Sequence, residues 1–275
     1  MNSRELVSDG FTGPPTGAGE TAPPDHASVR TGSASAATRL RVWDLPTRLF
    51  HWLLAASVSA AVVTGKVGGN LIEWHGRIGL LIFGLLTFRV VWGFIGSPTA
   101  RFASFVRGPA AIRAYLRGEW HGVGHNPLGA LSVLALLALT LAQVGSGLFS
   151  NDDIAFEGPL AGLVSKDWSN RASGVHDWLL YGLLGLIGLH VAAIAYYVRV
   201  RKDNLLRPMV TGWREIAAAA RETAAKSPAH PGSSALRFAV AASIAFTAAY
   251  AAAGHLLPAQ PPAPPPQAQH PSPSW

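Results

Sequence analysis

The chain contains no cysteine among its 275 residues. This absence excludes disulfide bonds, iron–sulfur clusters held by thiolates, thiol nucleophiles and the C-x-x-C-H attachment of covalent haem. Methionine is also scarce, with two residues. A metal or cofactor bound to this chain would therefore depend mainly on histidine, of which there are ten, or on carboxylates.

Charged side chains make up only 13% of the residues, whereas 49% are hydrophobic. The apolar residues are gathered into long blocks, which is typical of membrane proteins. The formal net charge of +7 comes from lysine and arginine that cluster beside these blocks, without a nucleic-acid-binding motif. We therefore expect contact with membrane lipid and no nucleic-acid partner.

Four apolar segments approach the ~20 residues that a helix needs to cross the hydrocarbon core of a bilayer. They cover residues 46–66, 75–96, 127–149 and 175–198. A fifth segment, 236–257, is long enough but rich in alanine. The sequence thus predicts an all-α transmembrane four-helix bundle with a fifth, C-terminal transmembrane helix. The predicted parts are a disordered N-terminal tail over 1–38, a membrane domain over 39–212, a cytoplasmic linker over 213–235, the fifth helix over 236–257 and a Pro-rich disordered tail over 258–275.

Lysine and arginine in the loops predict how the chain is oriented across the membrane. Arginines are concentrated between the second and third segments and again after the fourth, whereas the loop between the third and fourth segments is acidic. Positively charged loops tend to stay on the cytoplasmic side. We therefore expect a multi-pass protein whose N-terminus and residues 199–235 are cytoplasmic.

Four histidines lie within or at the ends of the four strongest apolar segments: His51, His75, His176 and His190. An ionisable side chain is costly there, so each is a candidate functional residue. In the predicted orientation, His51 and His190 lie near the cytoplasmic face. His75 and His176 lie near the external face, so the four residues form two pairs of matched depth.

The spacing of these histidines favours a haem protein. His176 and His190 are fourteen residues apart, close to four helical turns, so they share one helix face about 21 Å apart along the axis. Two histidines at equal depth on different helices suit bis-imidazole ligation of a b-type haem. Zinc usually requires three or four protein ligands. Two non-covalent haem b groups are thus the expected cofactors, although any single histidine could instead bond to a carbonyl at a helix interface.

Haem would also bring two propionates into a region of low dielectric constant. Arginine is their natural partner because it is planar and permanently charged. Arg48 and Arg89 are placed for the haem near the cytoplasmic face, and Arg77 or Arg171 could serve the external one. The helical period adds Gly65, fourteen residues after His51, as a small residue at the level where the first helix supplies no ligand.

Several stretches within residues 40–212 resemble a known family. They are WDLPTRLFHW running on to VVTG, WHGRIGLLIFGLLTFRVVWGFIGS, GHNPLGALSV and HDWLLYGLLGLIGLHVAAIAYYVRVRKDNLLRPMVTG. They look like the bacterial cytochrome b-561 and nickel–iron hydrogenase b-type cytochrome family. The resemblance implies a four-helix bundle that holds two b haems and passes electrons between the quinone pool and a redox partner. It implies as iron ligands the same four histidines that the depth argument selects: His51, His75, His176 and His190.

We therefore interpret the chain as an electron carrier of the bacterial cytoplasmic membrane, acting in the respiratory chain. The resemblance implies quinone or quinol as one partner, and a cytochrome or a dehydrogenase or hydrogenase subunit as the other. It leaves open quinone oxidoreductase activity and a homo-oligomer. Two alternatives remain: a non-redox membrane transporter, and a haem-bearing membrane anchor subunit of a dehydrogenase or hydrogenase complex.

The histidine pairing makes a prediction for His190→Ala. The variant should lose the haem near the cytoplasmic face and largely keep the other, because only one of the two sites loses an axial ligand. The haem content of the purified variant, taken from its reduced absorption spectrum, measures this. Unchanged haem content would contradict the pairing of His51 with His190.

Overall fold

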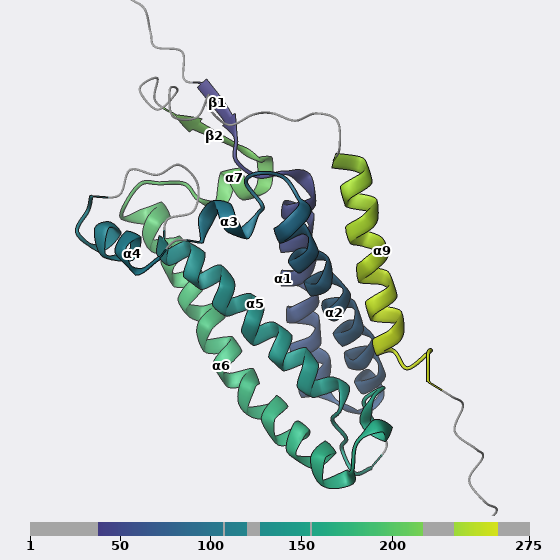
Figure 1. Ribbon diagram of the computed structural model, residues 1–275. Coiled ribbons are helices and arrows are strands. Elements are labelled where there is room, and N and C mark those ends of the chain that lie inside the picture. The colour runs from purple at the N-terminus through teal and green to yellow at the C-terminus, as the bar shows by residue number, and fades with distance from the viewer. Residues whose placement is uncertain (1–37, 107, 120–126, 155, 217–233, 258–275) are drawn as a thin grey trace, which may run out of the picture. The chain divides into compact units, whose positions relative to one another are not determined.

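The structure is a computed structural model that describes residues 38–106, 108–119, 127–154, 156–216 and 234–257 (Figure 1). The described residues all belong to one unit of the chain, which begins at residue 37. The two predicted tails, apart from Thr38, and most of the predicted linker lie outside the described residues.

The first two long helices form a hairpin. They are α1, Leu45–Val67, and α2, Ile72–Ile95, joined by the 3-10 helix η1, Gly69–Leu71. Asp44 caps α1, since its carboxylate accepts a hydrogen bond from the backbone N–H of Thr47 at 2.9 Å. This bond satisfies one of the N–H groups that have no partner within the helix.

A second hairpin follows. It consists of α5, Pro127–Leu148, and α6, Lys166–Arg199, with the 3-10 helix η2, Ala161–Leu163, in the connection between them. Ser165 caps α6. With 34 residues, α6 is longer than the ~20 needed to cross the hydrocarbon core, so it is long enough to extend beyond it.

Two short helices, α3, Phe102–Phe105, and α4, Pro109–Leu116, lie between α2 and α5. The hydroxyl of Tyr115 on α4 is hydrogen-bonded to that of Tyr197 on α6. Burial, together with this hydrogen bond, raises the pKa of Tyr115 to about 12. Tyr115 therefore stays neutral at physiological pH and joins α4 to the end of α6.

A two-stranded antiparallel sheet joins the chain before α1 to the chain after α6. It pairs β1, Thr38–Arg41, with β2, Trp213–Ile216, which follows the short helix α7, Leu206–Thr211. Arg214 donates to both carboxylate oxygens of Asp203, at 2.9 and 2.7 Å. The sequence pattern did not predict these strands, and β2 forms from the first four residues of the expected linker.

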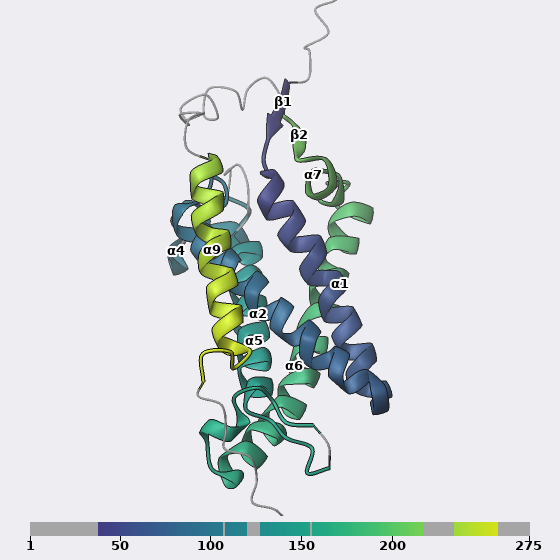
Figure 2. The same ribbon diagram turned by 90° about the vertical axis from the view of Figure 1, so that its right-hand side faces the viewer.

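Helix α2 lies at the centre of the bundle and packs against α1, α5 and α9. Ile82 and Leu86 of α2 and Val144 of α5 form a buried core. Helix α5 packs in turn on α6, whereas α1 and α6 make little direct backbone contact (Figure 2). Within an apolar 18-residue window of each helix, 11% of the residues are buried in α1 and 6% in α6, against 28% in the window of the span that contains α2. Most of the surface of α1 and α6 is therefore free to meet lipid or a bound group.

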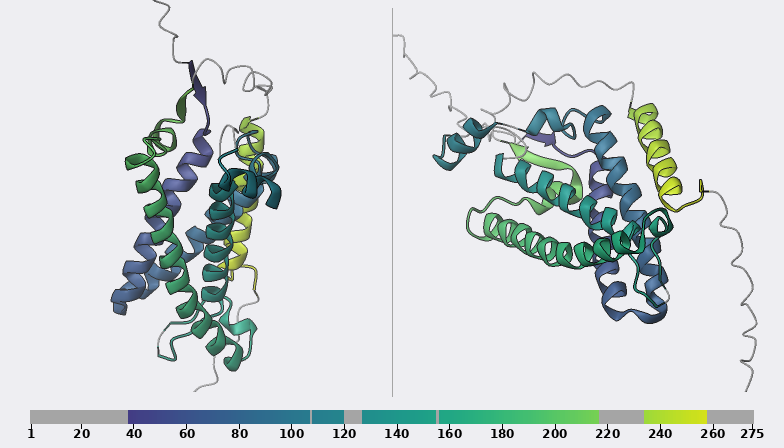
Figure 3. Two further views of the ribbon diagram at one scale, coloured as in Figure 1. Left: turned by 90° about the vertical axis from the view of Figure 1, so that its left-hand side faces the viewer. Right: turned by 60° about the horizontal axis from the view of Figure 1, so that its bottom comes forward.

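The last described helix is α9, Ser234–Ala252, which packs along α2 and lies apart from α6 (Figure 3). Ala241 is fully buried in this contact. Five of the described helices are long and apolar enough to cross a membrane, and one of them spans Ala235–Ala252. The predicted multi-pass helical bundle with an added C-terminal helix is confirmed.

The contact between α9 and α2 makes a prediction for Ala241→Leu. The larger side chain should lower the free energy of unfolding by about 1–3 kcal/mol, because Ala241 has no exposed surface into which added carbons could extend. The matched control is Ala239→Leu on the exposed side of the same helix, which should be nearly neutral. Thermal unfolding of both variants in detergent measures the difference, and equal midpoints would contradict the packing.

Candidate functional site

Two of the four candidate histidines lie side by side. The ring centroids of His75 on α2 and His176 on α6 are 5.9 Å apart, and the rings are nearly perpendicular, at 87°. A bond between a metal ion and an imidazole nitrogen is about 2 Å long, so two imidazoles on opposite sides of one metal have centroids roughly 6 Å apart. The outer pair, His75 and His176, therefore has a spacing that suits one iron ion between the rings.

A backbone carbonyl orients each imidazole of the outer pair. His75 Nδ1 lies 2.9 Å from the carbonyl oxygen of Ala61 on α1, and His176 Nδ1 lies 2.8 Å from that of Gln143 on α5. Because a carbonyl can only accept, Nδ1 carries the proton and Nε2 keeps its lone pair. A histidine that binds a metal usually donates its other ring N–H to such a partner.

A glycine four residues after each carbonyl lets the imidazole approach. A Cβ atom at Gly65 would lie 2.8 Å from His75 Nδ1, and one at Gly147 would lie 2.9 Å from His176 Cε1. Both distances are shorter than real Cβ contacts, so a larger residue would displace the ring. The two helix hairpins thus repeat one arrangement. The sequence singled out Gly65 but could not reveal the carbonyl partners, because every residue has a carbonyl.

The inner pair consists of His51 on α1 and His190 on α6. His190 is an electrostatic neighbour of His51, and both side chains are partly buried. His51 Nδ1 is shielded from solvent and has no hydrogen-bond partner among the described residues. The ring of Trp52 lies edge-on to His51, with centroids 5.0 Å apart. His51 and His190 are thus close enough to interact electrostatically, and the described residues give neither ring a carbonyl partner of the kind that the outer pair has.

Buried polar atoms without a partner gather near the inner pair. In the described part of the chain, five buried side-chain atoms have no hydrogen-bond partner, and four of them lie near the start of α1 or the end of α2. An unsatisfied buried polar atom costs about 1–3 kcal/mol, so such a cluster suggests a ligand. Arginine and histidine N–H groups suit carboxylate oxygens such as those of a haem propionate. The four atoms are Thr47 Oγ1, Arg48 Nε, His51 Nδ1 and Arg89 Nη1.

Both arginines predicted for the inner site lie there. Arg89 is 3% exposed, and its guanidinium lies 4.9 Å from the centroid of the Phe102 ring. Arg48 donates from Nη1 to the carbonyl oxygen of Val210 at 2.5 Å and keeps its buried Nε without a partner among the described residues. Each arginine therefore retains donor capacity for an anionic group.

The two arginines considered for the outer site have other contacts. The side chain of Arg77 is 64% exposed, lies 3.5 Å from a carboxylate oxygen of Glu73 and stands over the ring of Trp74. Arg171 stands over the ring of Trp168. Arg77 also follows the ligand candidate on α2 by two residues, which places it on a different helix face. A role for either arginine at the outer site stays a prediction without a supporting contact.

Each candidate site contains two histidines, without a third histidine or carboxylate ligand among the described residues. Within the ranges that the structure describes, no three side chains of histidine, aspartate or glutamate gather where a metal ion could bind. This composition suits haem, whose porphyrin supplies the other four iron ligands, better than zinc.

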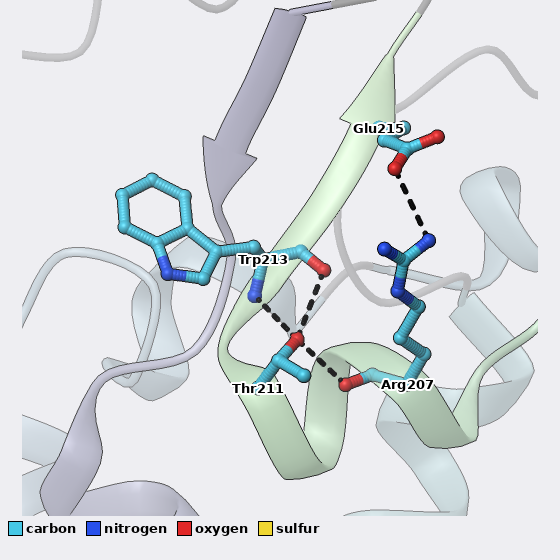
Figure 4. A pocket seen from close by; sticks show the side chains of 4 residues that line it. All are labelled: Arg207, Thr211, Trp213 and Glu215. Atoms are coloured by element: carbon cyan, nitrogen blue, oxygen red, sulfur yellow. Dashed lines mark hydrogen bonds and ion pairs between the residues drawn. The ribbon is translucent and has the colours of Figure 1, made fainter.

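A small pocket between α7 and β2 is not a further candidate site (Figure 4). It has a volume of about 80 Å³ and is lined by Arg207, Thr211, Trp213 and Glu215. Arg207 Nη1 donates to Glu215 Oε1 at 3.1 Å, and the Thr211 hydroxyl donates to the Arg207 carbonyl at 2.9 Å. These groups pair with one another, so the pocket is part of the structural link between α7 and β2.

A family match covers the four helices that carry or contact the histidine pairs. Residues 42–212 match the family described as prokaryotic cytochrome b561. The match ends before α9, which begins at Ser234.

Similar proteins carry names from hydrogenase systems. A protein of Azotobacter chroococcum mcd 1 named "Probable Ni/Fe-hydrogenase B-type cytochrome subunit" is 27% identical over 225 residues, which cover 64% of this chain and 89% of that protein. A protein of Azotobacter vinelandii with the same name is 26% identical over the same coverage. "Probable Ni/Fe-hydrogenase 1 B-type cytochrome subunit" of Escherichia coli K12 is 22% identical, over 63% of this chain and 89% of that protein. No solved structure matches the chain.

The close approach of Gly147 to His176 makes a prediction for Gly147→Ala. The added methyl group should displace the imidazole and reduce binding of the haem expected at the outer pair. Gly145→Ala is the matched control, because a Cβ atom there would meet no described atom within 4 Å beyond the adjacent backbone of its own helix. Haem content per purified chain measures the effect. Equal haem content in the two variants would contradict the outer site.

Proposed function

The chain belongs to the prokaryotic cytochrome b561 family, and from this premise we propose that it carries electrons across the membrane between the quinone pool and a redox partner protein. As a b-type cytochrome it uses haem b. The observation that carries the proposal is the outer pair, whose rings are 5.9 Å apart with Nδ1 of each ring bonded to a carbonyl.

We assign one haem to each histidine pair. His75 and His176 would hold the outer haem through Nε2, and His51 and His190 would hold the inner one. Each haem, when bound, supplies one-electron chemistry at its iron. The chain's own part is to hold the four imidazoles in place and, at the outer pair, to keep Nδ1 of each ring hydrogen-bonded to a carbonyl.

The charged residues of the inner site have a binding role in this proposal. Arg89 and Arg48 would pair with the propionates of the inner haem, because both keep buried N–H groups without partners among the described residues. Charge-assisted hydrogen bonds from arginine to a carboxylate are among the stronger contacts a protein can make. They would also place positive charge near the inner haem and so favour its reduced state.

The names of the similar proteins suggest which redox partner protein to test. Those proteins are named as cytochrome subunits of nickel–iron hydrogenases, so a hydrogenase subunit is the first redox partner to test. In that case the chain would also be the membrane anchor of the complex. Quinone or quinol would exchange electrons with the chain in the bacterial cytoplasmic membrane, with the N-terminus on the cytoplasmic side.

The decisive experiment is a haem assay combined with a redox titration of the purified chain. We expect a reduced b-type spectrum, about two haems per chain and two separate one-electron midpoints, because two sites with different surroundings are proposed. Addition of a quinol analogue such as duroquinol should reduce at least one haem. A colourless protein would instead favour a non-redox transporter, and a single haem would contradict one of the two sites.

A further inference from the structure

Asp44 and Trp92 link the start of α1 to the end of α2, and the proposed haem ligation uses neither residue. Asp44 Oδ2 accepts a hydrogen bond from the indole Nε1 of Trp92 at 2.9 Å. Its other oxygen, Oδ1, accepts from the backbone N–H of Thr47 at 2.9 Å. Both carboxylate oxygens are thus held, and the negative charge of Asp44 has a fixed position.

This fixed charge acts on Arg89. The carboxylate of Asp44 attracts the Arg89 guanidinium, which is almost fully buried and keeps Nη1 without a partner among the described residues. Arg89 is therefore attracted by a carboxylate of the chain and still has a buried N–H group available for an anionic ligand.

Helix α9 holds Trp92 from the other side. Trp92 is 2% exposed, and its ring stacks on Phe88 with centroids 5.7 Å apart. The ring of Phe238 on α9 packs edge-on against Trp92 at 6.3 Å, and Ala241 completes the same buried cluster. The family match ends before α9 and so assigns this helix no role.

We propose that Asp44 is a positioning residue that sets the reduction potential of the inner haem, and that α9 supports it by fixing Trp92. This inference rests on the proposed function. A nearby negative charge disfavours the addition of an electron, whereas the Trp92 N–H and Arg89 each offset part of that charge. Removing the charge of Asp44 should therefore raise the reduction potential of the inner haem, and removing the N–H group of Trp92 should lower it.

The test uses redox titrations of the purified full chain. Asp44→Asn keeps a good helix cap but removes the charge. It should raise the equilibrium constant for reduction of the inner haem about tenfold, which is a rise of about 59 mV in its one-electron midpoint potential. The midpoint potential of the outer haem should stay unchanged. Trp92→Phe keeps an aromatic side chain but removes the indole N–H group, so it should lower the midpoint potential of the inner haem. In the Asp44→Asn background, Trp92→Phe should have no further effect.

Two variants on α9 test its part. Phe238→Ala removes the ring that contacts Trp92 and should lower the inner midpoint in the same direction as Trp92→Phe. Phe246→Ala is the matched control on the same helix, because that ring is 72% exposed and stacks on Tyr250 instead. The two haems are distinguished by comparison with His190→Ala and Gly147→Ala, which should each lose one of them.

The outcomes separate this inference from the proposed function. Wild-type protein without haem would overturn the proposed function and the inference with it. Haem in the wild type with unchanged midpoints in all variants, or with equal shifts of both haems, would overturn the inference alone. If Asp44→Asn does not retain haem, Trp92→Phe and Phe238→Ala decide, because both keep the carboxylate cap. A lower midpoint of the inner haem in both variants supports the inference, and an unchanged or higher midpoint overturns it.

Discussion

A histidine inside the hydrocarbon layer needs a partner for each ring nitrogen, since no water is present to supply one. At the outer pair, backbone carbonyls supply the partner for one nitrogen of each ring, Nδ1. The carbonyls of Ala61 and Gln143 already belong to helices, but each oxygen has a second lone pair that accepts from Nδ1. Only glycine at the next turn lets the imidazole come close enough. The path of α1 beside α2, and of α5 beside α6, is therefore tied to the orientation of two imidazoles.

The inner end of the bundle is built differently. There buried nitrogens of Arg48, His51 and Arg89 have no partners among the described residues, and the hydrogen-bonded carboxylate of Asp44 attracts Arg89. A site of this kind suits an anionic ligand, because the cost of burying the donors is offset only when the ligand is bound. Helix α2 connects the two ends, since His75 and Arg89 are four turns apart on one helix face.

Much of the fold and of the candidate site could be predicted from the sequence. The lengths of the apolar segments were enough to locate the helices that can cross a membrane, including α9, because burial in lipid requires a continuous apolar run. Depth and helical period were enough to pair His75 with His176, and the structure brings these rings together. The same reasoning could not place Arg77, because a long flexible side chain can turn to the surface, where it meets Glu73.

The sequence by itself determined that the chain is a helical membrane protein, which family it belongs to and in which order its helices follow. It also determined the two depths at which histidines occur. Each of these properties depends on local composition, on a local motif or on a regular spacing of residues. Only the tertiary structure decided which carbonyls orient the imidazoles, which strand pairs with β1 and which groups surround Arg89. Asp44 caps α1 through one carboxylate oxygen, and its second oxygen accepts a hydrogen bond from Trp92, 48 residues away. Such contacts join residues that are distant along the chain, and no local pattern specifies them.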